Sequence, residues 1–209
     1  NGETDEGRAY VYYGSASGLS ITAKWTAESD QDSAKFSYSV ATAGDVNGDG
    51  YADVIVGAPN YDNGQTDEGR AYVYYGSAGG LSATPGWTVE SDQASAWFGY
   101  SVATAGDVNG DGYADVIVGA PNYDNGQTDE GRAFVYHGSA SGLSTTANWT
   151  AESDQDSAKF GYSVATAGDV NGDGYADVIV GAPNYDNGQA DEGRASVYHG
   201  SAGGLSATP

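Results

Sequence analysis

One nine-residue segment, Asp-Val-Asn-Gly-Asp-Gly-Tyr-Ala-Asp, occurs three times in this chain of 209 residues, at 45–53, 107–115 and 169–177. The copies lie 62 residues apart, and the sequence around them repeats with the same period. Residues 36–97 and 98–159 differ at only ten of 62 aligned positions. Such a period predicts an array of one supersecondary unit in which each copy packs on its neighbours. The fold of one unit therefore decides the fold of the chain.

Each unit contains the patterns of four short strands and shows no apolar period of helical length. Residues 38–44 carry small side chains, which suit a strand close to a crowded central axis. Residues 52–57 contain an unbroken Val-Ile-Val run, which predicts a strand buried on both faces. Two further strands are expected at 70–75 and around 87–90. We therefore predict an all-β chain, a β-propeller built of four-stranded antiparallel blades, with about three and a third 62-residue repeats.

The nine-residue segment joins the first two predicted strands and offers oxygen atoms at its positions 1, 3, 5, 7 and 9. Ca²⁺ takes six to eight oxygen ligands at flexible geometry, whereas Mg²⁺ demands a strict octahedron. An EF-hand does not fit, because position 12 is Val56 and the flanking segments are strands. A solvated turn that binds no ion is the alternative, and three copies in register favour the metal. The predicted ligands, for one Ca²⁺ in each loop and three in the chain, are Asp45, Asn47, Asp49, Tyr51 (carbonyl), Asp53, Asp107, Asn109, Asp111, Tyr113 (carbonyl), Asp115, Asp169, Asn171, Asp173, Tyr175 (carbonyl) and Asp177.

Two short signatures flank each loop at fixed spacing. Phe98-Gly99 precedes Gly119-Ala120-Pro121, and Phe160-Gly161 precedes Gly181-Ala182-Pro183, while the first copy has Phe36-Ser37 before Gly57-Ala58-Pro59. Over essentially its whole length the chain resembles the FG-GAP repeats of the integrin alpha-subunit β-propeller. The resemblance implies a calcium ion in each hairpin loop, on one face of the propeller. It also implies an extracellular or cell-surface location and a role in adhesion.

The repeat is cut in mid-unit at both ends of the sequence. We expect a partial blade with the third and fourth strands at 1–35, complete blades at 36–97 and 98–159, and a partial blade with the first three strands at 160–209, thirteen strands in all. Propellers close with about four to eight blades. The favoured partner is therefore a second copy that makes a ring of about six blades. A head-to-tail filament and a fragment of a longer array are the alternatives.

Composition narrows the class of function. A net charge of −22 disfavours nucleic acid and anionic membrane surfaces as partners. No run approaches the ~20 apolar residues of a membrane span. The only histidines, His137 and His199, occupy strand positions where other copies have Tyr13 and Tyr75, which favours a packing role over catalysis. No nucleophile and base pair is marked, so we predict no enzymatic activity and no catalytic residue.

The leading hypothesis is a calcium-binding, extracellular adhesion, interaction or self-assembly scaffold, whose ligand is a protein or a glycan. One alternative is a lectin, with Trp25, Trp87 and Trp149 as shelves for a glycan, although these rings are more simply core between blades. Another is an engineered or amplified repeat protein with no ligand beyond calcium. The recurrent Asp67-Glu68-Gly69-Arg70 is interpreted as a solvated turn with a local ion pair. The glycosylation tripeptide at 148–150 is weak support for secretion.

Overall fold

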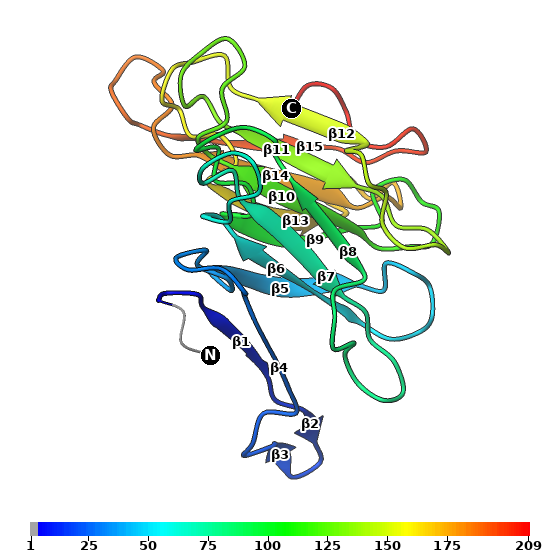
Figure 1. Cartoon of the computed structure of the whole chain (residues 1–209). Helices are drawn as coiled ribbons and strands as arrows, with labels where there is room; N and C mark the ends of the chain where they lie inside the picture. Colours follow the sequence, from blue (N-terminus) through cyan, green and yellow to red (C-terminus); the bar gives the residue numbers. More distant parts are fainter. Residues whose placement is uncertain (1–3) are drawn as a thin grey trace.

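The computed structural model describes residues 4–209, so residues 1–3 of the first predicted part-blade lie outside the described chain. Every regular element within this range is a β-strand, and the sheets succeed one another along the molecule (Figure 1). Across the described residues no helix has the length and apolar character that a membrane span requires. The strands are β1 (Arg8–Val11), β2 (Gly14–Ser15), β3 (Gly18–Leu19), β4 (Trp25–Glu28), β5 (Ser39–Gly44), β6 (Asp53–Ala58), β7 (Arg70–Tyr74), β8 (Trp87–Glu90), β9 (Ser101–Gly106), β10 (Asp115–Ala120), β11 (Arg132–Tyr136), β12 (Trp149–Glu152), β13 (Ser163–Gly168), β14 (Asp177–Ala182) and β15 (Arg194–Tyr198).

The strands form antiparallel meanders in chain order, which confirms the predicted four-stranded unit. Strands β5 to β8 make one complete sheet and β9 to β12 a second. The pair β1–β4 and the three-stranded sheet β13–β14–β15 are part-blades at the two ends of the array. The predicted division of the chain at 35/36, 97/98 and 159/160 stays a prediction, as does closure into a ring.

Residues 4–209 contain fifteen strands, whereas the sequence predicts thirteen. The extra pair, β2 and β3, is a small hairpin at the tip of the first part-blade, at the bottom of Figure 1. In the complete blade the equivalent turn packs closely, since a Cβ on Gly76 would lie 2.5 Å from the Ala52 carbonyl oxygen. A Cβ on the equivalent Gly14 would have no neighbouring atom within 4 Å. The first part-blade has no first and second strand whose hairpin could pack against this turn. The two sides of the turn instead pair with each other as β2 and β3.

The core lies between neighbouring blades. Ile55 and Val56 of β6 are both 0% exposed, which confirms the strand predicted to be buried on both faces. Ile55 belongs to the same apolar cluster as Val116 of the next blade. Val56 belongs to the cluster that contains Trp25 of the preceding part-blade. Each such side chain contributes about 1.5–3 kcal/mol by leaving water, so the blades stabilise one another through these contacts.

The two signature segments meet at the junction between blades. Phe98 is 0% exposed, and its backbone N–H donates to the Glu68 carbonyl oxygen of the preceding blade at 3.0 Å. A Cβ on Gly57 would lie 1.9 Å from the carbonyl oxygen of Gly99, so this crossing admits no side chain. The Phe-Gly of one blade therefore stacks directly on the Gly-Ala-Pro of the blade before it.

Candidate metal centres

The hairpin loop between β5 and β6 winds around the carboxylate of Asp45. Its Oδ1 accepts hydrogen bonds from the backbone N–H groups of Gly48 at 2.7 Å and Asp49 at 3.0 Å. Its Oδ2 accepts from the Gly50 N–H at 2.8 Å. Asp107 and Asp169 accept the equivalent three bonds in the other loops. The aspartate at position 1 of each loop thus holds the turn at positions 4 to 6 against its own carboxylate.

Positions 3 and 5 are held beside each other by their own hydrogen bonds. The Asp49 N–H donates to Asn47 Oδ1 at 3.1 Å, and Asn47 Nδ2 donates to Asp49 Oδ2 at 3.1 Å. Asp49 Oδ1 accepts from the Tyr51 N–H at 2.9 Å, which places the main chain of position 7 in the same turn. The structure therefore gathers positions 1, 3, 5 and 7 in one compact loop. Where the Tyr51 carbonyl points stays a prediction.

Asp53, the predicted ligand at position 9, makes two hydrogen bonds that the sequence did not indicate. Asp53 is 0% exposed; its Oδ2 accepts from the Val46 N–H at 2.9 Å and its Oδ1 from the Gly76 N–H at 2.8 Å. It thereby ties the hairpin loop to the turn between β7 and β8. Burial, with smaller additions from Asp49 and Asp45, raises the pKa of Asp53 above its ordinary value.

The same position behaves differently from blade to blade. Burial raises the pKa of Asp115 to about 7, although backbone amides oppose the shift. At Asp177 burial also acts upward, yet the N–H groups of Gly200 and Val170 together with His199 outweigh it and lower the pKa. His199 Nδ1 lies 3.4 Å from Asp177 Oδ1. The other histidine, His137, is half-buried, and burial lowers its pKa.

The loop residues fit a hard divalent cation in their chemistry. Each loop offers three carboxylates and one amide oxygen, and each oxygen of Asp53 that accepts one amide bond retains a second lone pair. The loop carboxylates are not the tightest acidic grouping, however. Within residues 4–209 the one group of three carboxylates whose ligand atoms all lie within 4.8 Å of one another is Glu68, Glu90 and Asp92.

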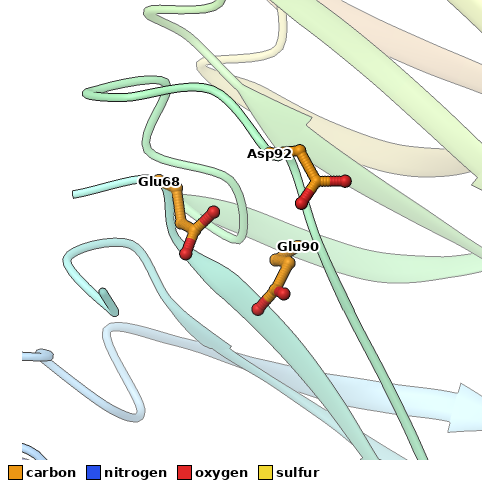
Figure 2. Close-up of side chains that lie close together, drawn as sticks. All are labelled: Glu68, Glu90 and Asp92. Atoms are coloured by element: carbon orange, nitrogen blue, oxygen red, sulfur yellow. The ribbon is translucent and has the colours of Figure 1, made fainter. Parts of the chain in front are cut away.

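Sequence reasoning missed this second acidic group. It treated Asp67-Glu68-Gly69-Arg70 as a solvated turn, and that interpretation is wrong for Glu68, which is 0% exposed. Arg70 pairs across the sheet, with its Nη2 2.6 Å from Glu90 Oε2. Figure 2 shows the three carboxylates gathered where β8 ends. The available signal was the recurrence of Glu-Gly-Arg together with Glu-Ser-Asp in the first three units, 22 residues apart at Glu68 and Glu90.

Trp25, Trp87 and Trp149 lie between blades. Trp25 and Trp87 are 8% and 5% exposed, and each indole Nε1–H donates to a backbone carbonyl of the next blade. The acceptors are Ser82 and Ser144, both at 2.8 Å. Trp149 donates to the Ser206 carbonyl at 2.9 Å. Trp149 is half-buried, and the burial of the other two rings together with the anchoring of all three favours the core interpretation over a shelf for a glycan.

Tandem antiparallel blades, each with an acidic hairpin loop between its first two strands, define a repeat protein of the β-propeller-blade class. The profile of the FG-GAP repeat matches residues 36–74, 98–136 and 160–198. The chain belongs to the FG-GAP repeat family.

Similar curated proteins are integrin alpha subunits. The chain is 39% identical to integrin alpha-7 of Rattus norvegicus over 148 residues, which covers 70% of this chain and 12% of the relative. It is 39% identical to integrin alpha-6 of Homo sapiens over the same length and shares. With integrin alpha-5 of Xenopus laevis it shares 31% identity over 209 residues, covering 96% of this chain and 19% of the relative. The chain thus spans less than one fifth of the length of these relatives.

Proposed function

We propose that this chain is a calcium-stabilised, non-catalytic β-propeller segment that acts outside the cell as a scaffold for adhesion-type protein interactions. The observation that carries the proposal is the preorganised loop, repeated with the same hydrogen bonds at Asp45, Asp107 and Asp169. Similarity to integrin alpha subunits supports the extracellular location and the interaction role. The loops lie at one end of the blades, each between the first and second strand.

Calcium would be held by the side chains at positions 1, 3, 5 and 9 and by the carbonyl at position 7 of each loop. When bound, the ion supplies positive charge that offsets the mutual repulsion of three neighbouring carboxylates. The chain's own part is to fix the loop: Asp45 orders the turn, and Asp53 joins it to the Gly76 turn. An ion bound in this way stabilises the hairpin and the contact between β6 and the β7–β8 turn.

Thermal unfolding with and without calcium tests the proposal. One site filled at a hundredfold excess over its Kd adds about 2.7 kcal/mol to the free energy of unfolding, so three sites should raise Tm by many degrees. The experiment compares scanning calorimetry in CaCl₂, in MgCl₂ and in EDTA. We expect a large rise in CaCl₂ and a smaller one in MgCl₂. Identical melting temperatures in CaCl₂ and EDTA would contradict a structural role for calcium.

We further propose that the scaffold associates with a second copy of itself. The open edge of β15 borders a groove of about 350 Å³ lined by Phe160, Arg194 and Tyr198. At the other end a groove of about 440 Å³ is lined by Tyr10, Trp25 and Val40. The first groove lies beside β15, at the position that the fourth strand occupies in a complete blade. The second groove lies beside β1, at the position that the first and second strands occupy in a complete blade. Each end of the array thus presents elements that the other end lacks.

A further inference from the structure

A second type of acidic cluster lies at the opposite end of the blade from the hairpin loop. In β6 the first residue, Asp53, belongs to the loop, whereas the last, Ala58, pairs with Arg70 at the start of β7. Arg70 in turn pairs with Glu90, the last residue of β8. Glu68 lies just before this level and Asp92 just after it. The cluster formed by Glu68, Glu90 and Asp92, hereafter the strand-end cluster, is therefore separate from the predicted calcium loops.

Glu68 is the buried member of the strand-end cluster. Its side chain is 0% exposed, and its Oε1 accepts a hydrogen bond from the Asn63 N–H. Its Oε2 is buried and has no hydrogen-bond partner among residues 4–209. In Figure 2 the Glu68 carboxylate points toward the other two. A buried polar atom without a partner is costly in a native protein and needs an explanation.

Neither Glu90 nor Asp92 donates a hydrogen bond or brings a positive charge to Glu68 Oε2. Glu90 is already engaged, because its Oε2 accepts from Arg70 Nε at 2.9 Å and Nη2 at 2.6 Å, and its Oε1 accepts from Asn63 Nδ2 at 2.7 Å. Asp92 is exposed. Within residues 4–209 Arg70 is the one cation in ion-pair contact with the cluster, and the guanidinium contacts Glu90. Three carboxylates thus share one positive charge.

The electrostatics of Glu68 show the same imbalance. Burial raises the pKa of Glu68, and the charges of Glu90 and Asp92 add to the shift. The backbone N–H groups of Asn63 and Gln65 act in the opposite direction and do not outweigh it. Such a carboxylate is stabilised either by a proton or by a cation placed among the three groups.

The strand-end environment recurs in the next blade. Glu130 is also 0% exposed, and neither of its carboxylate oxygens has a hydrogen-bond partner in the described chain. Arg132 and Glu152 repeat the ion pair beside it, at 3.1 Å. In the last part-blade, where no fourth strand is present, the equivalent Glu192 is exposed. The unpartnered buried carboxylate therefore accompanies a complete blade.

We propose that the strand-end cluster binds a divalent cation of the calcium type, with Glu68 Oε2 as the buried ligand and oxygens of Glu90 and Asp92 beside it. All three donors are carboxylate oxygens, which a hard cation prefers. One ligand atom from each residue already lies within 4.8 Å of the other two. The exposed position of Asp92 gives the ion a path from solvent. The blade formed by β5 to β8 would then carry a cation at both ends of its strands.

Counting bound ions tests this proposal directly. Equilibrium dialysis against radioactive Ca²⁺ compares the wild-type chain with Glu68→Gln, which keeps the shape of the side chain and removes its charge. We expect Glu68→Gln to bind one ion fewer per chain, with the loop ions retained. The control is Asp191→Asn, which removes a carboxylate from an exposed turn and should bind the wild-type number. An unchanged count in Glu68→Gln overturns the proposal and assigns Glu68 a proton or a purely structural role.

Thermal unfolding provides the second measurement. In EDTA, Glu68→Gln should melt at or above the wild-type temperature, because one of three mutually repelling carboxylates is neutral. In CaCl₂ it should gain less than the wild type. If Glu68→Gln fails to fold, the exposed Asp92→Asn takes its place, and it should also lose one bound ion. A full ion count in Asp92→Asn overturns the proposal. The loss of one ion is measured relative to the wild type, and the hairpin loops are unchanged in every variant. The outcome for the strand-end cluster is therefore separate from the outcome for the loops.

Discussion

At the residue scale, the position-9 aspartates carry most of what is specific to this chain. Asp53, Asp115 and Asp177 share one sequence environment and are all 0% exposed. Their carboxylates accept two backbone N–H groups each, from the loop and from the turn two strands later. Their pKa values nevertheless shift in different directions, because burial dominates at Asp53 and Asp115, whereas backbone N–H groups and His199 outweigh it at Asp177. The protonation of one repeated residue thus depends on its place in the array.

Asp115 should make the stability of the calcium-free chain depend on pH. Burial raises its pKa from 3.8 to about 7, so the folded chain binds this proton more tightly than the unfolded chain. The stabilising contribution is complete below pH 3.8 and is lost as the pH rises through about 7. In EDTA we therefore expect the free energy of unfolding of the wild type to fall over this range relative to that of Asp115→Asn. Urea titrations at several pH values measure both slopes, and parallel curves would contradict the assignment.

At the element scale, the sequence placed the strands well. The predicted second strand at 52–57 is β6, and the fourth at 87–90 is β8. An apolar run such as Val-Ile-Val indicates a strand buried on both faces, so it can be recognised without knowing which blade covers it. The turn at Gly76 packs against the loop between β5 and β6, whereas the equivalent turn at Gly14 forms the hairpin β2–β3. The local sequence does not predict this difference, because it depends on whether a hairpin of the same blade lies beside the turn.

The fourth strand of a complete blade is anchored to the next blade by its tryptophan. Trp87 is 5% exposed, and its indole donates to the Ser144 carbonyl at 2.8 Å. Trp87→Phe should keep most of the packing and lose about 1 kcal/mol with the hydrogen bond. Trp87→Ala should lose about 3–5 kcal/mol by leaving a cavity. Urea unfolding followed by circular dichroism measures both, and equal losses would mean that the hydrogen bond dominates.

At the scale of the whole molecule, the two complete blades differ in what covers their first strand. Val40 of β5 is 57% exposed, whereas its equivalent Val102 is 5% exposed. The difference arises because a preceding first strand covers Val102 and none covers Val40. The exposed Val40 thus marks a surface that a further blade would cover.

We expect the chain to form a discrete dimer in CaCl₂, and Val40→Asp to return it to a single-chain mass. A charge placed in an apolar contact costs far more than the same charge in water. The control is Ile21→Asp, since Ile21 is 98% exposed and its equivalents Ala83 and Thr145 are exposed in complete blades. Light scattering coupled to size exclusion measures the mass. A wild-type mass equal to that of one chain would contradict the self-association proposal. A broad range of large masses would indicate filaments in place of a ring.

The sequence by itself determined the repeat, the strands, the turns and the order of oxygen donors in each hairpin loop. The repeat is visible from the comparison of copies 62 residues apart, and the other features depend on short runs of neighbouring residues, so the sequence alone reveals them. The tertiary structure alone decided that Glu68 is buried beside Glu90, that Asp53 holds the Gly76 turn, and that Trp87 reaches Ser144. Burial and hydrogen bonding at these positions depend on strands that lie 20 or more residues away in sequence, as the pairing of Arg70 with Glu90 illustrates. Their energetics arise only when the blades are assembled.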